Sequence, residues 1–243
     1  MKKIYLLAFS CGISLLSIAQ QNLFNIPSGD ITLKGKVFYQ HQLNVYSKNV
    51  ESKGHFVYGL GKGWDVGVNL VGKGFYFQPN WRAKYNSNPN QGALYPMLMP
   101  TLQKQFMVKD NFAVNLGTQV GWNLSNKLSN KELLYYNYAL GIYYFNKKKS
   151  RVVAGAYQTT NFFVGNGNTT GAMLGYEINL SKRWYLMGDW VSGRNDAGVG
   201  VFGFMYNVSK RVQFCSGVLV PNGLSDRPMG VVLELNLLGW DVF

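Results

Sequence analysis

Large apolar side chains alternate with small or polar ones along most of this chain, with a period of two residues. The alternation is clearest over residues 112–122 and 134–144. Successive side chains of a β-strand point to opposite faces of the sheet, so each run predicts a strand with one apolar face. No window carries a 3.6-residue apolar stripe longer than two turns, and the pattern therefore predicts an all-β protein.

Short turn-forming segments alternate with longer polar segments between these runs. The short turns lie at 61–63, 108–111, 146–150, 181–182 and 209–210, and the longer segments at 47–51, 74–92, 123–132, 161–169, 192–197 and 221–228. They predict about twelve strands, which begin near residues 32, 52, 64, 93, 112, 133, 151, 170, 183, 198, 211 and 229. A tilted membrane-spanning strand needs about 9 to 11 residues, and most of these runs are long enough. The predicted fold class is a transmembrane antiparallel up-and-down β-barrel of about twelve strands.

A soluble β-sandwich is the alternative interpretation of the same alternation. Aromatic residues make up 15% of the chain, and many stand near strand ends, where a membrane barrel carries its interfacial girdles. Glycines such as Gly117 and Gly141 fall at inward positions, where a crowded, curved wall favours missing side chains. Both features favour the membrane barrel.

The first residues have the layout of an export signal. Lys2 and Lys3 precede an apolar run from residue 4 to residue 16, and small residues follow up to Ala19. We expect a signal peptide over residues 1–19, an N-terminal periplasmic segment or plug over 20–31, and an outer-membrane barrel over 32–243. The cell outer membrane of a Gram-negative bacterium is the predicted location. Cys215 is then the one remaining cysteine, so no intramolecular disulfide can form.

The net charge is strongly positive. It is +13 for the whole chain and +11 once Lys2 and Lys3 are removed (13 − 2). Nucleic acid would suit this charge, but export excludes it as a partner, and outer-membrane lipids or anionic solutes take its place. The basic residues of the short turns are expected to ring the periplasmic rim, where they contact lipid phosphates or, as the less favoured alternative, an envelope protein partner. They are Lys62, Lys109, Lys147, Lys148, Lys149, Lys182, Arg183, Lys210 and Arg211.

Two segments resemble known families. Residues 229–243 alternate outward apolar positions and stop at Phe243, which resembles the C-terminal strand of bacterial outer-membrane proteins and implies recognition by the barrel-assembly machinery. Residues 58–67 and 176–190 resemble hairpins of the small transporter-like barrels grouped under the phenol meta-degradation pathway name. That likeness implies a barrel with a role in transport, and it carries over no substrate-binding residue.

The inward positions of the predicted strands are polar. Charged groups are expensive in hydrocarbon, so those inside strands should face the lumen. In one interpretation they pair across the wall, with Lys34 and Lys36 meeting Glu234 where the first and last strands close the barrel. In the other they line a narrow aqueous path. The predicted lumen-lining residues are Lys34, Lys36, Asp65, Lys73, Glu177, Asp189 and Glu234.

About twelve strands leave room for a narrow pore or a binding cavity. We therefore expect a narrow porin-like channel or transporter for small solutes. The alternative is a plugged structural or accessory barrel of an envelope complex. The aromatic loop over residues 74–92 is expected either to fold inward as a lid or to form an interfacial belt.

An outer-membrane lipid hydrolase ranks third, and we expect no enzymatic activity. The sequence has two histidines: His41 lacks a serine two residues away, and Ser52 lies on the opposite face from the inward His55. No catalytic triad is assigned. No Cys/His cluster has the spacing of a metal site, so no metal or cofactor is expected.

Overall fold

The computed structural model describes residues 21–125, 132–223 and 227–241. The predicted signal peptide and the terminal Phe243 lie outside the described residues. Among the described residues, no helix has the length and apolar character needed to cross a membrane.

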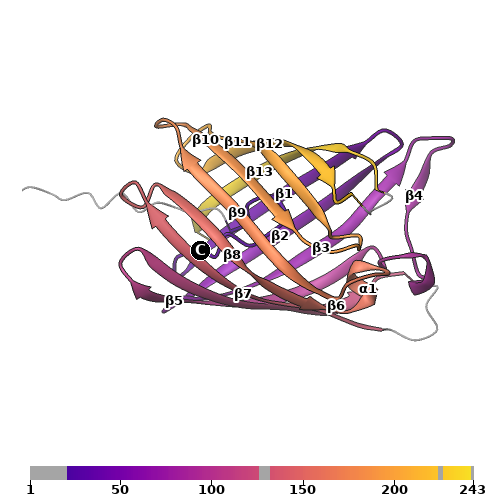
Figure 1. The fold of residues 1–243 in the computed structure, drawn as a ribbon, viewed down its shortest axis with the longest axis horizontal. Coiled ribbons are helices and arrows are strands. Elements are labelled where there is room, and N and C mark those ends of the chain that lie inside the picture. The colour runs from indigo at the N-terminus through magenta and orange to yellow at the C-terminus, as the bar shows by residue number, and fades with distance from the viewer. Residues whose placement is uncertain (1–20, 126–131, 224–226, 242–243) are drawn as a thin grey trace, which may run out of the picture.

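The chain forms a closed barrel of antiparallel strands (Figure 1). The ring consists of β1 (Lys36–Tyr46), β2 (Asn49–Gly61), β3 (Trp64–Tyr76), β5 (Met97–Lys109), β6 (Phe112–Asn123), β7 (Leu133–Phe145), β8 (Ser150–Thr159), β9 (Thr170–Asn179), β10 (Trp184–Val191), β11 (Val199–Asn207), β12 (Val212–Pro221) and β13 (Gly230–Asp241). Each strand pairs with its neighbour along the chain, and β1 pairs with β13 to close the ring. The prediction of an up-and-down barrel of about twelve strands is therefore confirmed.

Three small elements lie between these strands. The three-residue strand β4 (Arg82–Lys84) pairs with the end of β3, beyond the ring. A 3₁₀ turn (Pro89–Gln91) and the one-turn helix α1 (Asn161–Val164) occupy two of the longer loops. These loops gather at one end of the barrel, the loop end, and the short turns at the other, the turn end (Figure 1).

Two strand boundaries differ from the sequence prediction at the start of the barrel. β1 begins at Lys36, four residues after the predicted start near residue 32. The backbone N–H of Thr32 donates to the Asp65 carboxylate at 3.0 Å, so Thr32 stays inside the barrel and makes no ladder bond. The link between β1 and β2 is also shorter than predicted, because only Ser47 and Lys48 separate the two strands.

The two faces of the wall differ sharply in chemistry. Leu116 is 47% exposed on the outside of β6, whereas the adjacent Asn115 is fully buried inside. Phe202 on β11 and Leu235 on β13 are likewise exposed outward. A closed sheet satisfies all its backbone groups internally, and an apolar exterior of this kind is stable in hydrocarbon. The protein is therefore an outer-membrane β-barrel.

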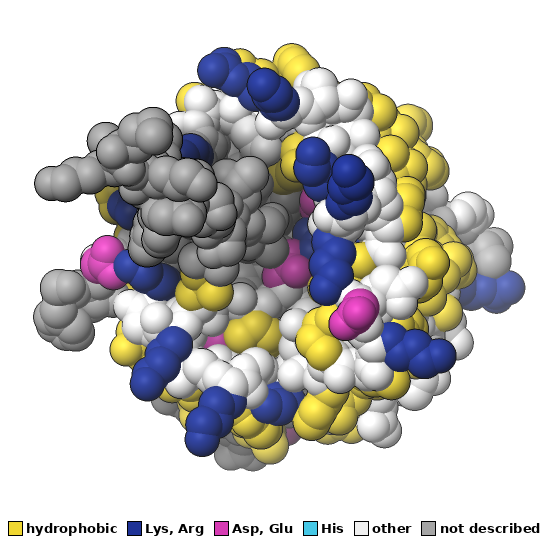
Figure 2. Space-filling model, turned by 90° about the vertical axis from the view of Figure 1, so that its left-hand side faces the viewer, with side chains coloured by type: hydrophobic (Ala, Val, Ile, Leu, Met, Phe, Trp, Pro, Cys, Tyr) yellow, Lys and Arg dark blue, Asp and Glu magenta, His cyan; other side chains and the backbone are white. Residues whose placement is uncertain are grey.

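The turn end carries a ring of basic side chains. Figure 2 looks onto this end and shows lysine and arginine side chains around the rim. The basic residues of the five turns, from Lys62 to Arg211, are all exposed. Aromatic residues such as Trp64, Trp184 and Trp240 project outward just beside this rim, as interfacial girdles do.

The apolar exterior predicts a strong position dependence for an added charge. Replacing Leu116, near the middle of β6, with lysine should lower the free energy of unfolding by about 2 to 4 kcal/mol, because the ammonium must enter hydrocarbon. Leu180 lies in the turn between β9 and β10 and is 63% exposed. Leu180→Lys is therefore the matched control, and it should change the free energy of unfolding by less than about 1 kcal/mol. Urea titration in lipid vesicles, followed by tryptophan fluorescence, measures both. Equal effects at the two positions would argue against a lipid-facing exterior.

Candidate functional site: the plugged lumen

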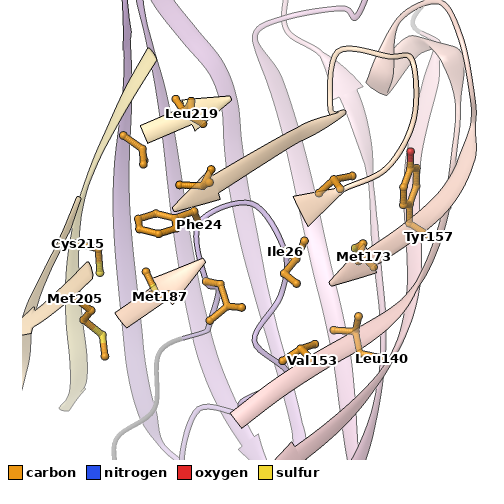
Figure 3. Close-up of a cluster of buried hydrophobic side chains, with 14 of the residues drawn as sticks. Phe24, Ile26, Leu140, Val153, Tyr157, Met173, Met187, Met205, Cys215 and Leu219 are labelled. Atoms are coloured by element: carbon orange, nitrogen blue, oxygen red, sulfur yellow. The ribbon is translucent and has the colours of Figure 1, made fainter. Parts of the chain in front are cut away.

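The segment before β1 fills part of the barrel interior. Residues 21–32, which we call the plug, run inside the wall, and their apolar side chains Leu23, Phe24 and Ile26 are at most 2% exposed. Figure 3 shows Phe24 and Ile26 on this segment, surrounded by side chains that project inward from the strands. The plug also folds on itself, since the backbone N–H of Ser28 donates to the carbonyl of Gln21 at 2.9 Å.

The interior wall formed by β7 to β13 carries both apolar and charged side chains, because Arg151, Glu177, Asp189 and Glu234 are buried there too. The prediction of a polar interior is wrong for the positions of this wall where the plug packs against inward-facing apolar residues. These residues are Leu140, Ile142, Val153, Met173, Met187, Val201, Met205, Cys215, Leu219 and Val232. The wall is apolar here because it contacts an apolar segment in place of water. Gly175 shows how close the contact is, because a Cβ added there would clash with Leu23 Cδ1.

Asp189 holds the centre of the plug. Its Oδ2 accepts hydrogen bonds from the backbone N–H groups of Phe24, Asn25 and Ile26, at 2.9, 2.5 and 3.0 Å. Three successive amides that converge on one carboxylate form an anion-binding nest. Asp189 is buried in the middle of β10, so this one side chain fixes the plug against the wall.

A second anchor is a buried triad of charges. Arg151 on β8 forms ion pairs with Asp30 of the plug and with Glu177 on β9, the latter at 2.6 Å. Arg151 and Glu177 are direct cross-strand partners. All three side chains are buried, and a single guanidinium between two carboxylates neutralises most of their mutual repulsion.

A third anchor joins the two ends of the plug to β3 and β5. Asp65 Oδ2 accepts from the backbone N–H of Thr32 at 3.0 Å and from Gln21 Nε2 at 2.9 Å. Gln103 Nε2 also donates to Asp65, at 3.1 Å. Because Gln21 and Thr32 are additionally bonded to each other at 2.7 Å, the plug is held as a closed loop.

A cavity of about 360 Å³ lies between the plug and the loop end. Plug residues Asn22, Phe24 and Asn25 form part of its lining, and the wall contributes mainly polar side chains. Asn22 Nδ2 donates to Gln40 Oε1 at 2.5 Å and lies 3.0 Å from His55 Nδ1. Within the described part of the chain, His55 Nε2 has no hydrogen-bond partner. The cavity therefore offers polar groups to a solute.

An ion cluster lies at the mouth of this cavity. Arg227 Nη2 contacts both carboxylate oxygens of Glu51, at 3.0 and 3.1 Å, and Lys84 forms a second ion pair with Glu51. Burial alone would lower the pKa of the Arg227 guanidinium, but Glu51, Tyr46 and Asp196 together outweigh it and the pKa is raised. The guanidinium also lies over the ring of Tyr46, 5.8 Å from its centroid. Lys84 belongs to the aromatic loop over residues 74–92. Its side chain lines the cavity, whereas Trp81 of the same loop is exposed on the outside.

Four of the seven predicted lumen residues lie inside the barrel. Asp65 and Asp189 contact the plug directly and Glu177 does so through Arg151. Glu234 is buried on β13 and accepts from Asn236 Nδ2 at 2.9 Å. Most of these acidic groups thus bind the protein's own N-terminal segment.

The three predicted lysines lie elsewhere. Lys34 is exposed and precedes β1. Lys36 forms an exposed ion pair with Asp241, its register partner, and the predicted contact between Lys36 and Glu234 is wrong because Glu234 pairs with Gln42 in the ladder. The register thus separates the two charges along the seam.

Lys73 is exposed because a bulge reverses the two faces of β3. Gly72 has a φ of +75°, and the pairing of β2 with β3 shifts at this point. An extra residue in one strand moves all later side chains to the opposite face. Lys73 therefore pairs with Ser52, which pairs in turn with Leu43 on the outside of the barrel.

Sequence reasoning missed the partners of these acidic groups. Arg151, Gln103 and Gln21 follow no motif, and only the fold shows that they converge on Asp30 or Asp65. Arg151 carried one usable signal, because it is a charged residue at the start of a predicted strand and needs an inward counter-charge. Glu51 and Arg227 stand 176 residues apart in the sequence, so no local pattern links them.

Comparison with known proteins adds little beyond the architecture. No known protein family matches the sequence, and no curated protein is significantly similar to it. An outer membrane channel from Pseudomonas putida F1 aligns with a TM-score of 0.47 and 12% identity over 86% of this chain and 97% of that one. An active-site mutant of outer membrane phospholipase A from Escherichia coli aligns with a TM-score of 0.45 and 13% identity, over 88% of this chain and 93% of that one.

The buried triad predicts a large effect of removing its arginine. Arg151→Gln leaves Asp30 and Glu177 facing each other without a counter-charge, and should lower the free energy of unfolding by about 3 to 5 kcal/mol. Lys36→Gln, which breaks the exposed pair with Asp241, is the control and should cost less than about 1 kcal/mol. Chemical denaturation of both variants in vesicles compares them. A mild effect at Arg151 would show that the triad is not needed to hold the plug.

Proposed function

We propose that this protein is a gated outer-membrane channel for small polar solutes, with the plug as its closed gate. The observation that carries the proposal is the cavity of about 360 Å³ below the loop end, whose inner side is formed by the plug. Small-molecule sites have volumes of about 300 to 1,000 Å³, so the cavity can hold one small solute.

The plug has the properties of a removable gate. It is a continuous segment before the first strand, so its release would leave every ladder hydrogen bond of the ring intact. It is held by two carboxylates and one arginine of the wall and by packing, without a covalent bond. Solute that binds in the cavity contacts Asn22 and Asn25 directly. Solute binding can release the plug only if the solute binds the open state more tightly than the closed state.

The cavity favours polar solutes of moderate charge. Lys53, Lys84 and Arg227 line it together with Glu51 and Asp196, so the basic side chains exceed the acidic ones by one. Carboxamide groups of Gln40, Asn69 and Gln119 also line the cavity. Amides and paired charges can replace the water around a polar solute. Because the charges of the lining nearly cancel, a strongly charged solute is not held tightly.

Loosening the plug should open the channel. Asp189→Asn removes the charge that three backbone N–H groups bind, and each hydrogen bond to a charged group contributes roughly 1.5 to 3 kcal/mol. Every 1.4 kcal/mol lost from the closed state raises the open-to-closed ratio about tenfold. We expect the full chain to be mostly closed in planar bilayers, Asp189→Asn to show frequent openings, and deletion of residues 21–31 to give a steady conductance.

The control is Ser216→Ala, a change on the outer face of β12, which should conduct like the unaltered chain. Resistance of the folded band to detergent without heating shows that each variant forms a barrel. A closed bilayer with the folded deletion variant would contradict the channel. That result would support the plugged structural barrel of an envelope complex, which co-purification of a stoichiometric partner would then test.

A further inference from the structure

A patch of polar side chains interrupts the apolar exterior across β1, β2 and β3. Tyr39 and His41 project outward from β1, Ser52 from β2 and Lys73 from β3. The neighbouring outward positions on β13, β1, β2 and β3 are largely apolar. They include Leu237, Leu235, Leu233, Leu43, Val45, Phe56, Val68, Leu70 and Phe75. Polar groups on a lipid-facing surface are expensive and mark a functional site by default.

The side chains of this patch form a hydrogen-bonded chain. Ser52 Oγ lies 3.2 Å from His41 Nε2, and His41 Nδ1 lies 3.0 Å from the hydroxyl oxygen of Tyr39. His41 pairs with Gly54, which has no side chain to separate the imidazole from Ser52 two residues away. A hydroxyl, an imidazole and a third group that orients the imidazole are the parts of an activated serine nucleophile.

Lys73 completes the patch. It is the direct cross-strand partner of Ser52, and paired residues on one face of a sheet have Cβ atoms about 4.5 to 5.5 Å apart. The bulge at Gly72 is what brings Lys73 to this face. An ammonium group beside the nucleophile can stabilise the oxyanion that forms when a carbonyl is attacked.

We infer that Ser52, His41 and Lys73 form a catalytic site on the membrane-facing wall that hydrolyses the acyl esters of lipids. Ser52 Oγ attacks the ester carbonyl while its proton passes to His41 Nε2, and Tyr39 accepts a hydrogen bond from His41 Nδ1. The tetrahedral oxyanion, stabilised by Lys73, collapses and breaks the ester C–O bond, and the alcohol leaves with the proton from His41. A water molecule from the interface then attacks the acyl-serine, again through His41, and releases a fatty acid.

The position of the patch fits an ester of a membrane lipid. Ser52 stands three residues from the loop-end terminus of β2 and nine from Gly61 at the turn end. At about 3.3 Å per residue and a tilt of about 40°, this places Ser52 roughly 8 Å below the β1–β2 hairpin, on the outer-leaflet side. Ester groups lie at the boundary between headgroups and acyl chains, within reach of this depth and close to interfacial water.

The test uses the full chain in detergent micelles and in phospholipid vesicles. A fluorophosphonate probe should label Ser52, and a fluorogenic phospholipid ester should be hydrolysed. Ser52→Ala should abolish labelling and hydrolysis, and His41→Ala should lower the rate by about 10² to 10⁴-fold. Added imidazole should partly restore His41→Ala, which would not happen if His41 had only a structural role. Tyr39→Phe should lower kcat by roughly two- to tenfold and leave KM unchanged, because Tyr39 acts through His41.

Ser216→Ala is the matched control, because Ser216 also faces outward but its cross-strand partners are Phe204 and Leu233. It has no histidine among these partners. The Ser216→Ala variant should hydrolyse the ester like the unaltered chain. The inference is overturned if the folded, unaltered chain neither reacts with the probe nor hydrolyses the ester. It is also overturned if hydrolysis persists in Ser52→Ala. Neither result depends on whether the plug opens, so the outer-wall site and the channel can fail separately.

Discussion

A β-sheet in hydrocarbon must pair all its backbone N–H and C=O groups, because no water is present to bind those left at an edge. Here the pairing of β1 with β13 removes the last edge. Once the ring is closed, every strand has one face toward lipid and one toward the lumen, and the alternation of side chains follows. Closure also fixes the lumen width, which for twelve strands is more than the wall side chains alone fill. The plug takes up part of that space.

The plug explains why the interior has both apolar and acidic walls. Leu23, Phe24 and Ile26 pack against the strands of the second half of the barrel, while buried carboxylates bind the plug's backbone and Arg151 binds its Asp30. These contacts fix the position of the plug, while the hydrogen bonds that close the ring do not involve it. On our proposals, the plug acts as a gate inside the barrel, while the patch around His41 acts on lipids at the exterior wall.

The sequence predicts the ring well because period-two alternation and turn residues are local signals, and from β6 onward the strand starts agree within a residue. It predicts the lumen less well. Alternation correctly predicts the inward positions of four residues, Asp65, Glu177, Asp189 and Glu234. It places Lys73 on the wrong face, because one extra residue at Gly72 reverses the faces of β3. The meeting of Ser52 with His41 depends on the register of two strands. An inspection of each histidine's own strand therefore could not find it.

The central claim is that the N-terminal segment is bound inside the barrel as part of its folded structure. Hydrogen exchange of the protein in lipid nanodiscs tests it most directly, at the amides of Phe24, Asn25 and Ile26 that donate to Asp189. A bound plug predicts that these three amides exchange far more slowly than an unstructured chain, with protection that falls in Asp189→Asn. Exchange at the rate of an unstructured peptide would show that the lumen is not occupied by this segment.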